Sequence, residues 1–268
     1  MSKASISFFI ENGWVAVPGA FTAEQAAPYS RRTIERLSLL PPLKRFDEAG
    51  RPVGLTLPYE KCFRLAKFAP AAWSLIVELI GGEDRIVDGS DFQYSDGFVV
   101  APPNARGWTP PAREGFRWHI DRDDGDQLRL DTMTTGLVVY GLWNDVEPRG
   151  GGTFMAPGAI PALARFLDDH PNGVSFSSFP IVSLLEECDP KFFEMTGALG
   201  TIILAHPLLP HAPSLNTSSL PRLLSVKKVE LRSPYRFSVY QAERTPVERA
   251  TLRALGRPPK MGRAKPPA

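Results

Sequence analysis

The chain has 268 residues, of which 43% are hydrophobic and 10% aromatic, so it is long enough to bury a substantial core. Its 31 basic and 29 acidic residues leave a net charge of +2, and no basic stripe with interleaved aromatics is present, which argues against nucleic-acid binding. No apolar run is long enough for a membrane span, no signal region opens the chain, and two cysteines are too few for a disulfide framework, so we expect a cytoplasmic protein.

The first third of the chain predicts helices. Thr22 is a suitable N-cap, with Gln25 as its capping-box partner, and helical periodicity continues from there toward Leu39. A second helix is predicted over 69–80, because two consecutive glycines follow an apolar run at that point. We therefore expect a helical N-terminal part that ends near residue 90.

The middle of the chain predicts short strands separated by turn signals. These strands lie at about 90–101, 116–121, 136–145, 152–155, 199–205 and 222–231. Many short antiparallel strands indicate a mainly β fold with flanking helices, built on a double-stranded β-helix, that is, a jelly-roll or cupin-like core. Residues 160–198 interrupt the strands with a helix around 162–169, and we expect this insertion to cover one mouth of the barrel and shape substrate access.

The turn signals and the local composition also predict the domain organisation of the chain. We expect one domain over 1–256, with the jelly-roll core at about 90–235. A short helix is predicted to begin near Pro246. Residues 257–268 are basic and proline-rich, which predicts a disordered tail.

Candidate metal ligands come from two distant parts of the chain. His119 and Asp121 are two residues apart in a predicted strand, where alternate side chains point to the same face and can grip one ion together. His211 follows an apolar strand far downstream. Two imidazoles and one carboxylate suit a non-heme ferrous iron and leave coordination positions open for a cosubstrate and O2, which implies catalysis.

Arg222 follows His211 after a turn-rich loop, and a hairpin there would bring the arginine back beside the histidine. A guanidinium is a planar fork that matches a carboxylate. An arginine near an iron with open positions is therefore well suited to the far carboxylate of a keto-diacid, for which 2-oxoglutarate is the natural candidate.

The other two histidines are weaker candidates. His170 stands at the end of a predicted amphipathic helix, where a cation meets the negative end of the helix dipole. His206 lies in the same strand region as His211, but only His211 is eleven residues from Arg222. We expect a structural or supporting role for His206.

In their order and spacing these motifs resemble the phytanoyl-CoA dioxygenase-like family of Fe(II)/2-oxoglutarate-dependent oxygenases. That family has His-x-Asp, a distal His and an Arg eleven positions later, as His119, Asp121, His211 and Arg222 stand here. The resemblance includes 8–21, similar to the family's opening helix, turn and strand, and the strand, glycine turn and Pro-Gly segment of 142–158. Together these segments span most of residues 8–232.

The resemblance implies a function and a set of site residues. His119, Asp121 and His211 would be the catalytic ligands of Fe(II), and Arg222 would bind 2-oxoglutarate. Ser214, Tyr140 and Thr153 are further expected cosubstrate contacts, although the family often carries serine where this chain has Pro213. The implied reaction uses O2 to oxidise a C–H bond and releases succinate and CO2. Hydroxylation is the expected type of oxidation. The intact Asp121 argues for oxygenation rather than halogenation.

Alternatives remain open at this stage. The acidic run at 121–126 would favour a cationic substrate if it bordered the pocket, or it is simply a solvated loop. We expect a small-molecule substrate and leave its class and the oligomeric state open. A cupin-like metal enzyme that does not use 2-oxoglutarate would have no need of Arg222, and a non-catalytic small-molecule-binding module is the third reading.

Overall fold

The computed structural model describes residues 3–40, 46–104, 107–121, 126–237 and 244–257. Within them the helices are α1 Lys3–Asn12, α2 Ala23–Leu39, α3 Leu65–Phe68, α4 Pro70–Ile80, α5 Ile160–Asp168, α6 Ile181–Cys188 and α7 Pro246–Ala254. The strands are β1 Trp14–Val17, β2 Leu55–Thr56, β3 Cys62–Arg64, β4 Gln93–Ser95, β5 Phe98–Ala101, β6 Gln127–Leu128, β7 Thr135–Leu142, β8 Phe154–Met155, β9 Val174–Ser175, β10 Phe193–Glu194, β11 Ile202–Ala205, β12 His211–Ala212 and β13 Arg222–Glu230.

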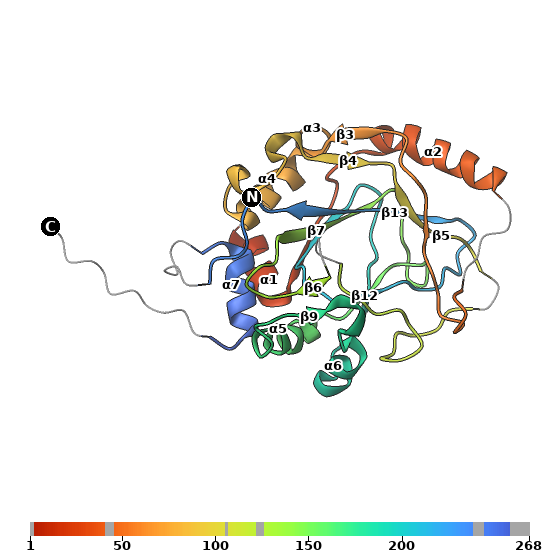
Figure 1. The fold of residues 1–268 in the computed structure, drawn as a ribbon. Coiled ribbons are helices and arrows are strands. Elements are labelled where there is room, and N and C mark those ends of the chain that lie inside the picture. The colour runs from red at the N-terminus through yellow and green to blue at the C-terminus, as the bar shows by residue number, and fades with distance from the viewer. Residues whose placement is uncertain (1–2, 41–45, 105–106, 122–125, 238–243, 258–268) are drawn as a thin grey trace.

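Two antiparallel sheets form the core. Within the described residues the larger sheet has six strands in the order β1-β11-β7-β13-β5-β2, and the smaller has three in the order β10-β8-β12. Helices flank this core on several sides, with α2, α3 and α4 over one face of the large sheet (Figure 1). The mainly β fold with a jelly-roll core that the sequence predicts is therefore confirmed.

The strand β7 lies inside the large sheet, and every one of its residues is buried. Just after it, Trp143 is fully buried and stacks at 5.6 Å from Phe68, between the sheet and the helices above it. The indole Nε1 donates a hydrogen bond to the Ser225 hydroxyl, 2.6 Å away on β13. This aromatic packing holds the helical layer on the face of the sheet that points away from the smaller sheet.

Local signals placed the helices well. Thr22 and Gln25 form the predicted capping box at the start of α2. The helix α4 ends at Gly81, whose φ of 88° is the left-handed conformation that glycine adopts without strain. The helix α7 begins at Pro246 as predicted, and the opening segment forms α1, a turn at Gly13 and β1.

Two strand predictions need correction. The run 90–101 contains two strands, β4 and β5, because the chain turns at Asp96 and Gly97, where the Asp96 carboxylate accepts hydrogen bonds from two backbone amides. The run 116–121 is not a strand: it forms only one isolated bridge, between His119 and His211. It remains extended, and its side chains still alternate between buried and more exposed positions.

The predicted hairpin between His211 and Arg222 is also wrong. The strand β12 pairs with β8 in the small sheet, whereas β13 pairs with β5 and β7 in the large one. The loop between them crosses from one sheet to the other. His211 and Arg222 therefore approach the same space from opposite sheets of the jelly roll.

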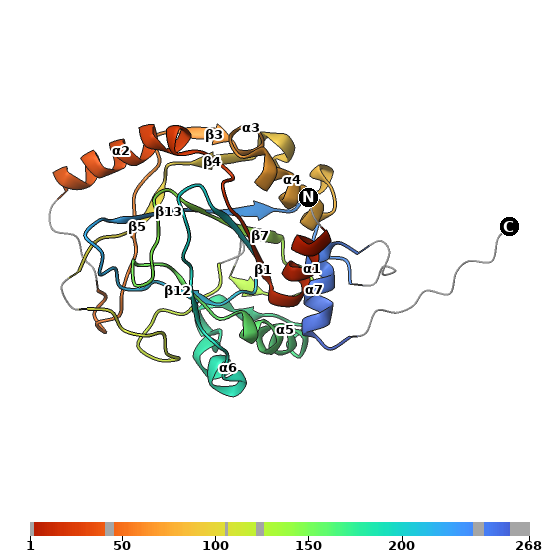
Figure 2. The same ribbon diagram turned by 180° about the vertical axis from the view of Figure 1, so that it is seen from behind.

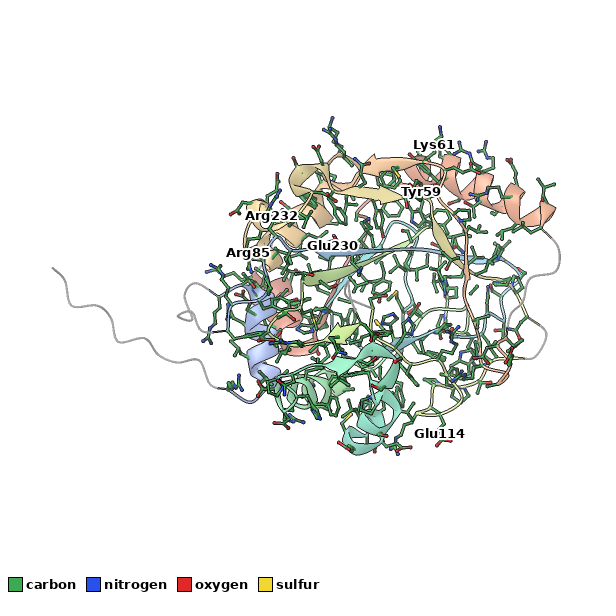
Figure 3. All side chains as sticks on the ribbon, viewed as in Figure 1. Tyr59, Lys61, Arg85, Glu114, Glu230 and Arg232 are labelled. Carbon is green, nitrogen blue, oxygen red and sulfur yellow. The ribbon has the colours of Figure 1, made fainter. Side chains whose placement is uncertain are left out.

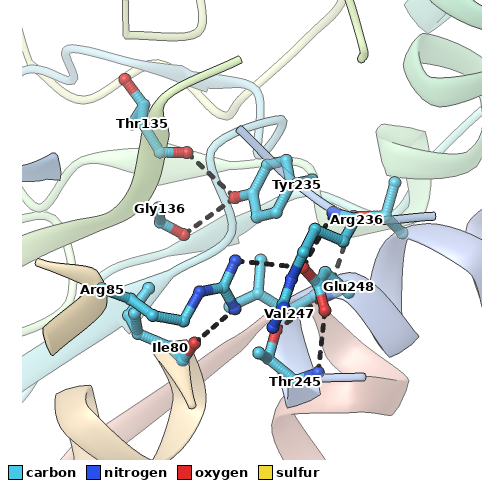
Figure 4. A network of polar contacts seen from close by, with 10 residues as sticks. Ile80, Arg85, Thr135, Gly136, Tyr235, Arg236, Thr245, Val247 and Glu248 are labelled. Atoms are coloured by element: carbon cyan, nitrogen blue, oxygen red, sulfur yellow. Dashed lines mark hydrogen bonds and ion pairs between the residues drawn. The ribbon is translucent and has the colours of Figure 1, made fainter. Parts of the chain in front are cut away.

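The insertion at 160–198 folds into α5, α6 and short strands on one side of the core (Figure 2). Its helix α5 packs against α7. In α7 the fully buried Glu248 pairs with Arg85 at 3.1 Å, which fixes this C-terminal helix to the segment after α4 (Figure 4). The predicted tail lies outside the described residues from 258 onward, and none of the described helices is long and apolar enough to cross a membrane.

Most polar side chains project outward from this frame (Figure 3). Tyr59 and Lys61 lie on the segment that precedes β3 and next to α2, where Arg32 and Arg36 of α2 both pair with Glu60. These pairs are partly exposed and contribute little to stability. Further buried polar groups lie near the histidines of the jelly roll and at α7.

Candidate metal centre

His119, Asp121 and His211 meet between the two sheets. One candidate ligand atom from each side chain lies within 4.8 Å of the other two. The imidazole rings of the histidines are 4.2 Å apart between centroids, and the His211 Nε2 is 3.9 Å from the Asp121 Oδ2. The structure thus brings together the three residues that sequence spacing selects.

The backbone holds the two histidines in register. The amide of His119 donates to the carbonyl of His211 at 2.9 Å, and the amide of His211 donates back to the carbonyl of His119 at 2.8 Å. This reciprocal pair is a single bridge outside any regular strand. It joins two segments that are almost a hundred residues apart in the chain, so neither ligand position is set by local sequence alone.

Hydrogen bonds also decide which ring nitrogen faces the centre. The Nδ1 of His119 lies 2.8 Å from the Arg117 carbonyl, and the Nδ1 of His211 lies 3.1 Å from the Leu209 carbonyl. A carbonyl oxygen only accepts, so each Nδ1 carries the proton and each Nε2 presents a lone pair. Backbone carbonyls that orient imidazoles in this way are typical of metal-binding histidines.

Two buried polar atoms further indicate that these donors suit a divalent metal ion. The Oδ2 of Asp121 and the hydroxyl of Tyr140 are buried, yet neither makes a hydrogen bond within the described residues. A buried carboxylate oxygen without a partner is costly, because its desolvation is not offset. An ion held by Asp121 and the two Nε2 atoms would supply the missing partner, and the nitrogen and oxygen donors suit non-heme iron.

Burial sets the protonation of this region. The pKa of His119 is lowered to about 4, mainly by burial and to a smaller extent by the neighbouring His211. This imidazole is therefore neutral and able to bind a metal at neutral pH. Burial, followed by the negative charge of Asp121, raises the pKa of Tyr140, so its phenol stays protonated. The phenol is therefore uncharged beside Asp121.

A cavity of about 600 Å³ opens from the three residues, and His119, Asp121, His211, Tyr140 and Arg222 all line it. This volume is in the range of small-molecule sites, roughly 300–1,000 Å³. The cavity is where a cosubstrate and a substrate would meet the ion.

Arg222 is 2% exposed and lies at the start of β13. Its Nε donates to the Gly151 carbonyl at 2.8 Å and one Nη donates to the Val99 carbonyl at 2.9 Å. Burial lowers its pKa to about 10, so the guanidinium is charged at neutral pH. These contacts hold a buried cation against the cavity, which is the arrangement that receives an anionic group.

The other expected cosubstrate contacts divide into two kinds. Thr153 and Tyr140 line the cavity with Arg222, whereas Ser214 is not among the lining residues. Instead the Ser214 hydroxyl donates to the Gly152 carbonyl at 2.6 Å. Gly152 has no room for a side chain, because a Cβ there would lie 2.2 Å from the Met195 carbonyl oxygen. Ser214 thus supports the glycine turn whose Gly151 carbonyl holds Arg222.

The remaining histidines lie outside this centre. His206 is buried, its Nδ1 accepts from the Leu208 amide at 3.1 Å, and its Nε2 contacts the Thr251 hydroxyl at 2.9 Å. Burial lowers its pKa to about 3. His170 follows α5, stacks on Phe166 and contacts the Phe166 carbonyl. The contacts of His206 agree with the supporting role expected for it, and His170 lies just beyond the end of α5, as the sequence predicts.

Sequence reasoning missed several residues that line the cavity. Arg51 and Arg117 lie on one part of the wall, and Phe176, Ile181 and Val182 from the insertion lie on another. Arg117 carried a usable signal, because it alternates with His119 and Asp121 along the same extended segment. Arg51 carried none, since its place depends on the packing of a distant turn.

No protein-family model matches the chain, and no curated protein matches it in sequence. Solved structures with a similar fold were found. One is the non-heme alpha ketoglutarate dependent carbocyclase SnoK from nogalamycin biosynthesis, with 14% identity, a TM-score of 0.54 and 87% of each chain covered. Another is AviO1 from Streptomyces viridochromogenes Tue57, with 15% identity, a TM-score of 0.52, and 86% of this chain and 96% of the other covered. At these identities the likeness defines the fold.

Proposed function

We propose that the protein is an Fe(II)/2-oxoglutarate-dependent dioxygenase that hydroxylates a C–H bond of a small organic molecule and releases succinate and CO2. The observation that carries the proposal is the buried Asp121 Oδ2, which makes no hydrogen bond within the described residues. It lies beside two imidazoles whose Nδ1 atoms donate to backbone carbonyls, in a cavity that a buried arginine also lines. The fold shared with SnoK, a protein described as alpha ketoglutarate dependent, supports it.

Each site residue then has a defined task. His119 and His211 would hold the ion through Nε2, and Asp121 would add the single negative charge. Arg222 would bind the distal carboxylate of 2-oxoglutarate through charge-assisted hydrogen bonds. Bound iron and 2-oxoglutarate supply the activation of O2 and the oxidation of the C–H bond.

Two further side chains would assist the cosubstrate. Thr153 and Tyr140 line the cavity together with Arg222. The Tyr140 phenol remains a proton donor, so it would donate a hydrogen bond to Asp121 or to a cosubstrate oxygen. Ser214 would act indirectly, through the Gly152 carbonyl that its hydroxyl contacts.

We further propose that residues 1–256 form one catalytic domain that acts in the cytoplasm on a free small molecule, and not on nucleic acid or at a membrane. The basis is the balanced charge of the chain and a cavity of about 600 Å³ that suits a small ligand. Turnover of free compounds would support this statement. If only macromolecular substrates stimulated succinate release, the small-molecule part would be wrong.

A titration tests the centre itself. Fe(II) and then 2-oxoglutarate are added to the full-length protein without oxygen, and the weak visible charge-transfer band of a chelated keto acid is recorded. We expect the band in the wild type and in His170→Ala, and its loss in His211→Ala. Iron binding without the band would favour the cupin-like enzyme, and no iron binding would favour a non-catalytic module.

Arg222 separates the oxygenase from the cupin-like alternative, which does not need it. Arg222→Gln removes a charge that contributes roughly 1.5–3 kcal/mol per charge-assisted hydrogen bond, so 2-oxoglutarate should bind about 10- to 100-fold more weakly. Arg129 is half-buried, pairs with Asp131 and is not among the described lining residues of the cavity, so Arg129→Gln provides the control variant. Circular dichroism checks the fold of both variants. Unchanged affinity in folded Arg222→Gln would mean that another cation binds the distal carboxylate.

A further inference from the structure

The cavity wall carries more positive charge than the proposed cosubstrate needs. Among the described lining residues, the guanidinium groups are those of Arg51, Arg117 and Arg222, and the only carboxylate is that of Asp121. In the proposed function Asp121 is taken by the ion and Arg222 by 2-oxoglutarate. Neither Arg51 nor Arg117 has a task in that proposal.

Within the described part of the chain, the carboxylate that pairs with these two arginines is that of Asp47, and Arg51 already engages it. Asp47 accepts from the Arg51 amide at 2.9 Å and from the Arg51 Nε at 2.8 Å. The backbone hydrogen bond from Arg51 is the largest cause that lowers the Asp47 pKa, so this carboxylate is ionised. Arg117 is farther from Asp47, at 4.0 Å. The group of three residues therefore has a surplus positive charge, located mainly on Arg117.

Arg117 is close to the metal centre along the chain. Arg117, His119 and Asp121 alternate with the buried residues of the same extended segment, so the three side chains project to one side. Residues two apart in an extended chain are separated by roughly 6–7 Å. The Arg117 carbonyl also accepts the Nδ1–H of His119. A group bound by Arg117 would therefore lie a short molecular length from the ion.

The insertion supplies an apolar part of the same wall. Phe176 lies in the segment before α6, and Ile181 and Val182 form the first turn of that helix. Val182 is 37% exposed, although it is a hydrophobic residue beside a cavity. An apolar ligand surface placed against these side chains would remove them from water and stabilise the complex.

We propose that this cavity binds an amphipathic organic carboxylate, with its carboxylate on Arg117 and its apolar body against Phe176, Ile181 and Val182. Under the proposed function this ligand is the substrate, and that identification rests on the proposed function. The acidic run that would favour a cationic substrate has residues 122–125 outside the described part of the chain. The lining residues that are described favour an anion.

The test compares three probes with the same eight-carbon tail: octanoate, octylamine and 1-octanol. Each is titrated into the full-length protein without metal, and binding is followed by calorimetry and by tryptophan fluorescence, because Trp118 lines the cavity. We expect octanoate to bind most tightly. Arg117→Gln should weaken octanoate about tenfold and leave 1-octanol unchanged, and added salt should reduce the difference, because the Arg117 side chain is 54% exposed.

Matched variants make the outcome specific. Arg129→Gln should leave all three affinities unchanged, and Arg117→Glu should reverse the preference from octanoate to octylamine. If octanoate affinity fell only in Arg222→Gln, the carboxylate would be bound by Arg222 and the inference would be wrong. Equal affinity for the three probes would also overturn it.

The inference and the proposed function fail in different ways. Loss of the keto-acid band with Arg117-dependent octanoate binding intact would remove the oxygenase and keep the carboxylate site. The band without any preference for octanoate would keep the oxygenase and reject the substrate class.

Discussion

The candidate metal centre and the network around Glu248 are both buried and polar, but they differ in how fully their groups are hydrogen-bonded. In the Glu248 network every carboxylate oxygen has a partner: one accepts from Arg85 and from the Arg236 amide, and the other from the Thr245 amide (Figure 4). At the candidate centre the Asp121 Oδ2 and the Tyr140 hydroxyl make no hydrogen bond within the described residues. A satisfied network holds the fold together, whereas the unsatisfied one is suited to receive an external partner.

The same contrast separates two histidines that are five residues apart. Both nitrogens of His206 have partners inside the protein, the Leu208 amide and the Thr251 hydroxyl. Among the described residues, the His211 Nδ1 is hydrogen-bonded to the Leu209 carbonyl, whereas its Nε2 points toward Asp121, 3.9 Å away. Burial alone therefore does not distinguish a structural histidine from a candidate ligand. The two kinds of histidine differ in whether a ring nitrogen remains without a hydrogen bond to the described residues.

The largest expected effect is at Asp121. Asp121→Ala should abolish oxygenation and weaken Fe(II) binding more than about 100-fold, because changes to residues that merely orient ligands already cost roughly 10- to 100-fold. The same variant should keep or raise the melting temperature of the metal-free protein, since it removes a buried oxygen that makes no hydrogen bond within the described residues. Calorimetric scans with and without Fe(II) measure both effects. If the metal-free protein became much less stable, Asp121 would have a structural role like that of Glu248.

Glu248 should show the opposite behaviour. Glu248→Ala leaves Arg85, which is mostly buried, without its partner, so we expect the free energy of unfolding to fall by about 3–5 kcal/mol. Urea denaturation measures this loss, with the exposed Glu35→Ala as control. Glu248→Gln should lose less, because its amide oxygen still accepts a hydrogen bond. Fe(II) affinity of the folded fraction should stay unchanged, and a change there would link the two regions.

His206 makes the comparison visible as a pH dependence. Its pKa is lowered to about 3 in the folded protein, against about 6.5 unfolded, so only the unfolded state binds a proton between these values. Stability due to this group is therefore lost as the pH falls below 6.5, by about 2 kcal/mol between pH 7 and pH 5. His206→Asn should be less stable at pH 7 but lose about 2 kcal/mol less over this range. Parallel curves for the two proteins would contradict this.

The smallest effect on stability is expected at Tyr140. Its hydroxyl is buried and makes no hydrogen bond with the residues that the structure describes, so Tyr140→Phe should change the free energy of unfolding by less than about 1 kcal/mol. If the hydroxyl supports the ion through Asp121, Fe(II) affinity should fall up to about tenfold. Anaerobic metal titration and urea denaturation of the same variant separate these effects. If Tyr140→Phe lost much stability but kept its metal affinity, the hydroxyl would support the fold and not the ion.

The sequence predicted those parts of the fold that depend on local interactions. The capping box of Thr22 and Gln25 and the glycine stop at Gly81 are formed by residues within one turn of each other, so the start of α2 and the end of α4 followed from the residues themselves. Alternating and continuous apolar runs likewise placed β7, β11 and β13 within a few residues. These signals need no knowledge of the rest of the chain.

Pairing between distant segments was less predictable. The run 116–121 has the alternation of a strand, but its backbone finds only His211 as a partner, so it forms a bridge and not a strand. The hairpin expected between His211 and Arg222 fails because each strand finds a better neighbour in a different sheet. Strand pairing depends on which backbone groups remain free after the whole sheet has formed.

The sequence by itself determined the donor types and their spacing: two histidines, an aspartate on the same side as the first, and an arginine beyond the second. Only the tertiary structure decided that they meet in one cavity, that each imidazole turns its Nε2 inward, and that Ser214 turns toward Gly152. It also brought Arg51 and Arg117 to the cavity wall. These outcomes depend on close packing and on hydrogen bonds between segments far apart in the chain, which no local pattern contains.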